Sequence, residues 1–438
     1  MSDETEPPEE TQVRSIDEIE ESLEPVTLIE QSRVTLRVGR MMLAAGTASY
    51  RVKQAMADVS AALGVHEHSN HVSLTEISAT SHRGRIFRTE VTENRSFAVN
   101  VDRLAHLDRL RRTLPERTTP AEVHRALDEI EGRGALYPGV VNGAVAGLAC
   151  AAFAVLNGAV PWEVAVVFMA AFLGQTTRRV LAHRHFNGFG VTMVAGAVAT
   201  GLYSLGVAVA SAIGGDDASV TLHAAGYISS VLFLLPGFAL ITGALDMAKN
   251  DIQSGIQRIA YGTMIVLAAG VSVWAVSQLT VLETAPRSGE HGSIAVDVAL
   301  WAVPSLCGVL GFALMFNSPW RLALTAALIG ALANTGRLWA IDAGLETQIA
   351  TALACLVVGC LAAWAARGGR FPVITLSVPA VLVMIPGVPA HEALVSLNSG
   401  DYAAATAGIL EVSLIMLSIM VGLVAAKLVT DREWSFAA

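Results

Sequence analysis

Charged residues are scarce in this sequence: they make up 15% of its 438 residues, whereas 53% are hydrophobic. Soluble domains carry about a quarter charged residues, so the composition predicts a membrane protein. The formal net charge of −9 comes from residues 1–24, which hold ten acids and one base. The remaining acids and bases balance, so the net charge indicates no ligand, and no nucleic-acid partner is expected.

Motifs for metals, disulfides and nucleotides are also missing. The four cysteines all fall inside apolar runs, without a CxxC pair or a Cys/His cluster, which argues against a disulfide framework and a zinc site. No GxxxxGK[ST] segment occurs, so the chain is not expected to use ATP directly. The N-terminus is acidic and lacks the apolar region of a cleavable signal. We therefore expect no metal and no cofactor.

The first 133 residues precede any run long enough to cross a membrane. Residues 1–25 are rich in Glu and Pro and are predicted to be a disordered tail. Residues 26–133 combine helical spacing of apolar residues with alternating segments, which predicts a small cytoplasmic α+β domain. Its expected elements are a helix over 26–65, strands over 71–78, 85–91 and 95–101, and helices over 102–112 and 120–131.

Ten apolar runs follow, each about 20 residues long and able to span a bilayer. They fall into two sets of five, over residues 136–280 and 292–430. The fold class is therefore a mainly α membrane protein with ten transmembrane helices after the small domain. The runs lie near 136–158, 160–178, 190–212, 221–247, 256–280, 294–316, 319–340, 344–366, 371–397 and 402–429.

The two sets of runs repeat each other. Pro236-Gly237 interrupts the fourth run, and Pro386-Gly387 interrupts the ninth. Polar segments in matching order, 175–178 and 334–337, stand near the ends of the second and seventh runs. Because five is odd, the second set is predicted to be inverted relative to the first, which is the plan of many secondary transporters. The distribution of Lys and Arg places the N- and C-termini in the cytoplasm.

The N-terminal segment carries a glycine-arginine pair, a glycine and an arginine-valine pair, at Gly39-Arg40, Gly46 and Arg51-Val52. Together with the α+β domain and the paired Pro-Gly helices, these residues resemble the threonine/serine exporter family over residues 30–430. The resemblance implies proton-driven export of threonine and serine across a bacterial plasma (inner) membrane. It also implies that the two five-span units occur elsewhere as separate chains, a pair linked to export of a dicarboxylic acid.

Both Pro-Gly pairs are predicted to break their helices, because proline removes a backbone donor and clashes with the preceding turn. The half-helix after each break would direct free amides and partial positive charge into the protein, a site for a substrate carboxylate. The alternative is a structural kink that binds nothing. The candidate residues are Pro236, Gly237 and Phe238 at the first break and Pro386 and Gly387 at the second.

Acids inside apolar runs are costly in lipid and commonly face a cavity. Glu411 lies deep in the last run and is predicted to carry the transported proton, with a hydrogen-bonded structural role as the alternative. Asp246, at the end of the fourth run, is a second proton-coupling candidate, although a solvated cytoplasmic loop accounts for it nearly as well. Glu392, just after the second break, is a third.

Polar side chains in the second and seventh runs are candidates to hydrogen-bond the hydroxyl and ammonium groups of an amino acid. They are Gln175, Thr176, Asn334 and Thr335. Contacts between helices explain these side chains equally well. The neighbouring Arg178 and Arg337 are expected to extend to a membrane interface rather than to bind a carboxylate.

Three hypotheses of function follow. The first is a proton-coupled exporter of threonine and serine, whose partners are the small amino acid, protons and the lipid bilayer. The second keeps the exporter and changes its cargo to a dicarboxylate such as succinate. The third is a membrane-associated hydrolase, which would need a catalytic cluster within 26–133. GxxxG steps at Gly139, Gly143 and Gly147 favour close helix packing within one chain or between copies, so a homo-oligomer stays open.

Overall fold

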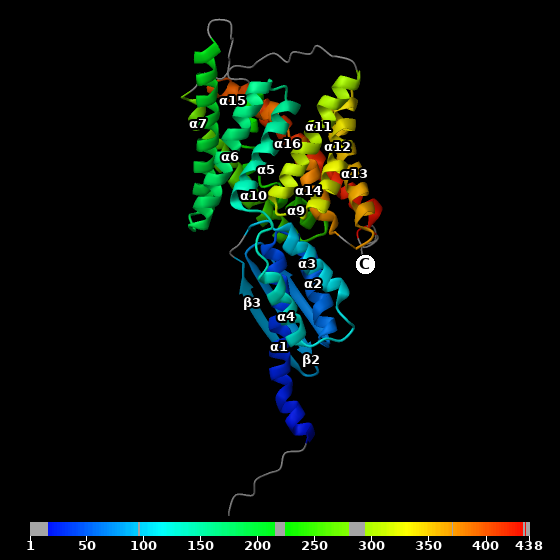
Figure 1. Ribbon diagram of the computed structural model, residues 1–438. Helices are drawn as coiled ribbons and strands as arrows, with labels where there is room; N and C mark the ends of the chain where they lie inside the picture. The colour runs from blue at the N-terminus through cyan, green and yellow to red at the C-terminus, as the bar shows by residue number, and fades with distance from the viewer. Residues whose placement is uncertain are drawn as a thin grey trace, which may run out of the picture.

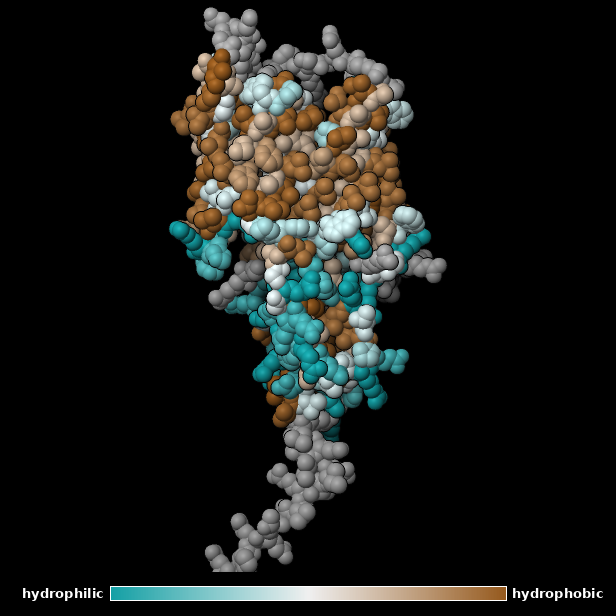
Figure 2. Space-filling model, viewed as in Figure 1, coloured by the Kyte–Doolittle hydropathy of each residue, from teal (hydrophilic) through white to brown (hydrophobic). Residues whose placement is uncertain are grey.

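The computed structural model describes residues 16–94, 97–214, 224–279, 294–369, 371–431 and 434. Figure 1 shows two parts, a small domain of helices and strands and a larger bundle of helices. On the face shown in Figure 2, hydrophobic side chains form a wide band across the bundle, whereas hydrophilic side chains cover much of the small domain. Such a band is the surface that a protein exposes to the interior of a bilayer.

The small domain packs helices against a three-stranded antiparallel sheet with the strand order β1-β2-β3. Buried Ile77 and Ala79 of β2 lie in its core, and α1 packs on β2 and β3. The α+β class is therefore as predicted. The elements are α1 (Ile16–Ala44), α2 (Ser49–Ala62), β1 (Glu67–Val72), β2 (Glu76–Arg83), β3 (Ile86–Glu93), α3 (Val101–Thr113) and α4 (Pro120–Glu131).

The helix predicted over 26–65 is in fact two helices. Gly46 has a φ of +94°, a conformation that L side chains rarely adopt, and it lies in the turn that ends α1. Helix α1 also begins earlier than predicted, at Ile16, because the Glu- and Leu-containing stretch after it favours a helix. Residues 1–15 of the predicted tail lie outside the described residues.

The predicted strands are shifted in the structure. Residues 71–78 hold the end of β1, a turn and the start of β2, rather than one strand. The third predicted strand, over 95–101, is wrong for 97–100, which form no strand, and residues 95 and 96 lie outside the described residues. The backbone here pairs with the bundle instead, since the amide of Val101 donates to the carbonyl of Phe316 at 3.0 Å.

The bundle contains eight helices long and apolar enough to cross a membrane, among the residues described. Two bent pairs bring the number of spans to ten if each pair is one span, as predicted. The long helices are α5 (Gly139–Leu156), α6 (Pro161–His183), α7 (Gly188–Gly214), α10 (Ile252–Ser277), α11 (Ile294–Met315), α12 (Trp320–Asp342), α13 (Thr347–Ala366) and α16 (Tyr402–Thr430).

The bent pairs contain the two Pro-Gly breaks. In the first, α8 (Ala224–Ser229) and the 3-10 turn η2 (Leu232–Leu234) meet α9 (Gly237–Ala248) at 64°. In the second, α14 (Val373–Val381) and η3 (Leu382–Met384) meet α15 (Gly387–Asn398) at 48°. Both half-helices begin at the glycine that follows the proline, so the helix breaks are confirmed at related positions.

The two sets of helices pack in the same pattern. Within the first set α5 packs on α6, α6 on α7, and α10 on both α7 and α9. Within the second set α11 packs on α12, α12 on α13, and α16 on both α13 and α15. Helix α5 packs on α11 and α8 packs on α15 between the sets. This matched packing supports a duplicated unit, and the inversion of one unit relative to the other stays a prediction.

The glycines of the GxxxG steps serve contacts inside the chain. A Cβ on Gly147 would lie 2.7 Å from the backbone oxygen of Phe168, and one on Gly143 would meet the ring of Phe172. Both contacts are with α6. On the facing helix, a Cβ on Gly311 would lie 2.6 Å from the oxygen of Val145, which explains the close approach of α11 to α5.

Candidate functional site

The two breaks expose backbone groups that must find partners inside the bundle. At the first break, Arg178 Nη1 donates to the carbonyl oxygen of Phe233 in η2 at 3.1 Å. Arg178 therefore stabilises the broken segment rather than extending to a membrane interface. Phe238, the second residue of α9, is buried and packs its ring on Phe316 at 4.9 Å between centroids.

A cavity of about 220 Å³, which we call the polar cavity, lies beside the second break. It is lined by residues of α5, α12, α13, α15 and α16. Figure 1 shows α15 at the end of the bundle that lies away from the small domain, whereas α9 lies near that domain. The cavity brings together five residues selected from the sequence, namely Asn334, Pro386, Gly387, Glu392 and Glu411.

Arg337 supplies the positive charge of the polar cavity. Its Nε donates to Asn334 Oδ1 at 2.9 Å, and its Nη1 donates to Thr351 Oγ1 at 3.3 Å. Asn334 is held in turn, because its Nδ2 donates to Ser305 Oγ at 2.8 Å. The guanidinium is thus fixed on the cavity wall by neutral groups, and it keeps its charge for a ligand.

Two carboxylates face the same cavity, those of Glu392 and Glu411. Within the described part of the chain, neither carboxylate forms an ion pair with a basic side chain. The first amides of α15, at Gly387 and Val388, start a twelve-residue helix and add partial positive charge. The lining of the polar cavity thus combines one guanidinium, two carboxylates and a helix N-terminus, groups that can pair chemically with anions and with cations.

The other candidate residues lie away from the polar cavity. Gln175 Nε2 donates to Asn142 Oδ1 at 2.8 Å, and Thr176 Oγ1 donates to the carbonyl of Phe172 at 2.8 Å. The Gln175 bond joins two helices, which is the alternative explanation given above, whereas the Thr176 bond lies within α6. Pro236, Phe238 and Thr335 also lie outside the residues that line the cavity.

A second cavity of about 610 Å³, which we call the apolar cavity, touches both breaks. Gly237 of the first break and Pro386 and Gly387 of the second line it. Almost all of its other lining is aliphatic, with the hydroxyls of Thr263 and Ser413 as polar members. Residues of both breaks therefore line one shared cavity, and its walls are apolar.

Asp246 does not lie in a solvated loop. Its side chain is fully buried and accepts hydrogen bonds from the amide of Ser49 at 2.8 and 3.1 Å and from that of Tyr50 at 3.4 Å. These are the first amides of α2, which have no partner within their own helix. Arg258 Nε lies 3.0 Å from Asp246 Oδ2, and its Nη2 donates to Ser49 Oγ at 3.2 Å. Asp246 thus ties the small domain to α9.

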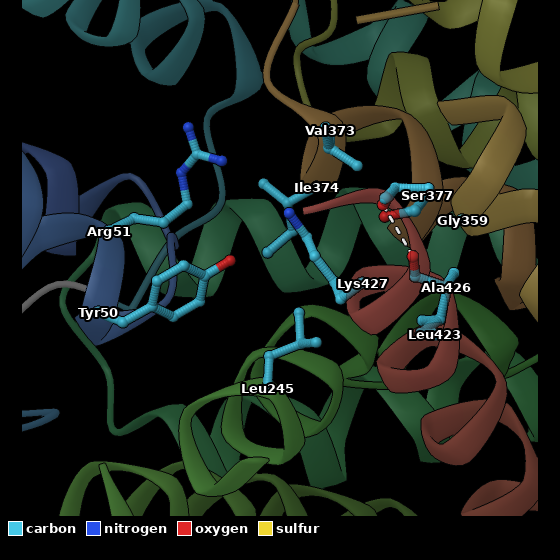
Figure 3. Close-up of a pocket in the computed structure, with 11 residues that line it drawn as sticks. Tyr50, Arg51, Leu245, Gly359, Val373, Ile374, Ser377, Leu423, Ala426 and Lys427 are labelled. Atoms are coloured by element: carbon cyan, nitrogen blue, oxygen red, sulfur yellow. Dashed lines mark hydrogen bonds between the residues drawn. The ribbon is translucent and has the colours of Figure 1, made fainter. Parts of the chain in front are cut away.

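The small domain touches both units of the bundle. Besides Asp246, the amide of Leu74 donates to Gln257 Oε1 at 2.9 Å in the first unit. The amide of Asp102 donates to the carbonyl of Asn317, between α11 and α12 of the second unit, at 3.2 Å. Figure 3 shows a small cavity of about 20 Å³ in this interface, where Tyr50 and Arg51 lie opposite residues of α14 and α16 that include Ile374 and Lys427.

Three polar residues of the bundle were missed. Asn157 and Thr347 line the polar cavity, and both stand at helix ends, where polar residues usually serve as caps. Glu163 is fully buried and accepts a hydrogen bond from the hydroxyl of Tyr203. Glu163 stands two residues after Pro161, at the start of an apolar run. An acid in the first turn of a predicted span is the signal that could have found it.

Comparisons with known proteins agree with this architecture. Residues 33–280 match the ThrE family model, which is described as "Putative threonine/serine exporter", and residues 302–429 match a second model described as "Threonine/Serine exporter, ThrE". The chain is 27% identical over 253 residues to the "Probable succinate transporter subunit YjjP" of Escherichia coli. The aligned region covers 55% of this chain and 91% of that protein. The protein of the same name from Klebsiella aerogenes is 26% identical, and the alignment again covers 55% of this chain and 91% of that protein.

Among solved structures, none matches this chain. The two family models together cover the α+β domain and both sets of spans. The family and the relatives are transporters, so the hydrolase hypothesis is set aside. The chain therefore belongs to the threonine/serine exporter family and is a multi-pass membrane transporter rather than an enzyme.

Proposed function

We propose that this protein exports a small zwitterionic amino acid, threonine or serine, from the cytoplasm in exchange for protons. The observation that carries the proposal is the charge set of the polar cavity. Arg337 and the amides after Pro386 suit the substrate carboxylate, and Glu392 and Glu411 suit its ammonium. Asn157 also lines the cavity, and its amide oxygen is a polar partner for a side-chain hydroxyl.

Protons and substrate would compete for the same carboxylates. When Glu411 is ionised, it attracts the substrate ammonium; when it takes up a proton, that attraction is lost and the substrate leaves. A proton that enters from outside and leaves to the cytoplasm then drives the substrate outwards. Alternate binding of the proton and the substrate at one cavity is sufficient for this exchange, provided that the cavity opens to one side of the membrane at a time.

The conformation described here is the one open to the outside in this scheme. The polar cavity lies at the end of the bundle away from the small domain, which the distribution of basic residues places in the cytoplasm of a bacterial inner-membrane protein. At the other end, Phe238 packs on Phe316, and Phe97 of the small domain packs on Tyr261 at 4.9 Å between ring centroids. The small domain would thus close the inner side, and exchange would require these ring contacts to open.

A dicarboxylate is the second candidate cargo, since relatives carry the name of a succinate transporter subunit. Two substrate carboxylates would meet one guanidinium and two acidic side chains in the polar cavity. Like charges at close range are costly unless protons neutralise them. The charge set therefore favours the zwitterion over the dianion.

Reconstituted full-length protein tests the proposal. Proteoliposomes would be loaded with labelled threonine, serine or succinate, and efflux would be followed with and without an opposing pH gradient. Gradient-dependent efflux of threonine or serine, and little of succinate, is expected. Preferential succinate efflux would overturn the proposed cargo, and efflux insensitive to the gradient would overturn proton coupling.

A further inference from the structure

The apolar cavity has no role in binding a zwitterion, because its walls offer almost no polar partner. It lies between the two units, with α8, η2 and α10 on one side and α15 and α16 on the other. We propose that this cavity binds one hydrocarbon chain of a membrane lipid. The binding itself does not depend on the proposed cargo or on proton coupling.

The cavity opens sideways, toward the bilayer. Helices α10 and α16 flank it, and each packs on helices of its own unit, α10 on α7 and α9 and α16 on α13 and α15. On the rim, Val266 of α10 is 36% exposed and Leu417 of α16 is 54% exposed. Both residues belong to spans, and the surroundings of a span at this depth are lipid chains. The occupant that reaches the opening first is therefore a hydrocarbon chain.

The inner part of the cavity suits such a chain better than water. Its volume of about 610 Å³ is within the range that holds a drug-sized molecule. A water molecule needs two or more polar partners, and the Ser413 hydroxyl already donates to the carbonyl of Ile409 at 2.8 Å. Deep in the cavity, Leu232 and Leu234 are 3% and 2% exposed. An empty space of this size would forfeit dispersion contacts along all its walls, which a chain restores.

A bound chain would also support the second break. Ile385, Pro386 and Gly387 line both cavities, so this segment separates the apolar cavity from the polar one. Removing the chain would leave one side of the segment without packing, and we expect the geometry of the polar cavity to loosen. The lipid chain thus acts on transport through the break and not through contact with the substrate.

The first experiment fills the cavity from within. Gly270 lines it, and a Cβ at this position meets nothing within 4 Å, so Gly270→Phe extends into open space. Gly201→Phe is the matched control, because Gly201 of α7 has the same open surroundings and lies outside the cavity. Native mass spectrometry of the full-length protein, purified in mild detergent, counts retained phospholipid. We expect Gly270→Phe to retain one phospholipid fewer than the wild type and Gly201→Phe.

Equal retention in all three proteins, or none in the wild type, would overturn the proposal. So would a wild-type dimer that Gly270→Phe alone abolishes, because a second copy would then fill the cavity. Should Gly270→Phe fail to fold, wild-type proteoliposomes with a phospholipid that carries a mid-chain diazirine decide the matter. Cross-links to buried Leu232 or Leu234 support the site, since bulk lipid does not reach them. Cross-links confined to exposed residues refute it.

Discussion

At the scale of residues, the acids of the polar cavity have no acidic counterparts in the first unit. At the offset that relates Pro236 to Pro386, Glu411 corresponds to Tyr261 and Glu392 corresponds to Thr242. Tyr261 packs on Phe97 of the small domain, whereas Glu411 faces a cavity. The duplicated framework therefore carries two cavity-lining carboxylates in the second unit where the first unit has a tyrosine and a threonine.

Substitution of Glu411 by Gln tests its role as the proton carrier. Gln mimics the protonated acid at nearly the same size, so folding and insertion should persist. We expect gradient-driven export to fall by about ten- to a hundredfold, the equivalent of losing one charge-assisted contact of about 1.5–3 kcal/mol. Passive substrate exchange should continue at a reduced rate, because Arg337 and Glu392 still line the cavity. Efflux from proteoliposomes, measured over a range of external pH, checks both.

Glu346→Gln is the control for this substitution, because Glu346 is an exposed acid directly before α13, outside the polar cavity. It should leave export and its pH dependence unchanged. If Glu411→Gln exported at the wild-type rate with the wild-type pH dependence, Glu411 would be structural and the proton would travel elsewhere.

At the scale of elements, the helices could be predicted more completely than the strands or the cavity. A Pro-Gly pair inside an apolar run locates each break, because proline acts on its own helix. The predicted strands were displaced from the observed ones. Alternation of apolar and polar residues near 71–78 and 95–101 reveals neither the turns nor the hydrogen bond of Val101 with the bundle. Glu411 can be recognised in the sequence as an acid in an apolar run. Whether Arg337 and Asn157 line the cavity depends on packing between helices that are distant in the sequence, which the sequence pattern does not reveal.

The second break depends on the absence of a side chain at Gly387. A Cβ there would lie 2.6 Å from Phe153 Cε1, so Gly387→Ala must displace that ring, which lines the polar cavity. We expect transport to fall while the protein still inserts. Gly201→Ala, where a Cβ meets open space, should keep full transport and gain up to about 1 kcal/mol of helix propensity. Efflux and thermal unfolding, measured on both variants, decide whether a loss of transport in Gly387→Ala comes from the altered break or from a change in helix stability.

The junction of α2 with α9 depends on Asp246. Asp246→Asn leaves Arg258 buried without a counter-charge, and breaking such a pair costs about 3–5 kcal/mol. We expect the small domain to detach more readily and the segment after α4 to become sensitive to limited proteolysis. Adding Arg258→Gln should recover part of the lost stability, since no isolated charge remains. Unchanged proteolysis and thermal unfolding in Asp246→Asn would show that the carboxylate does not hold the domain.

At the scale of the whole molecule, the small domain contacts both units and lies at the end opposite to the polar cavity. The proposal that this domain closes the inner side predicts that linking residue 97 to residue 261 stops transport. Short bifunctional cross-linking of the pair Phe97→Cys and Tyr261→Cys should abolish efflux, and reversal of the cross-link should restore it. The uncross-linked double variant is the control. Full efflux with the cross-link in place would show that the domain need not move.

The packing of α5 on α11 has a further consequence, because both helices belong to one polypeptide. Two separate chains would meet by mass action, and their interface would have to overcome the lost freedom of association. Tethering converts that encounter into an intramolecular step at an effective concentration in the millimolar range. The fused chain thus holds its halves at a fixed one-to-one ratio at any expression level. Their mutual interface is free to be weaker, and more easily rearranged during a transport cycle, than one that must first recruit its partner.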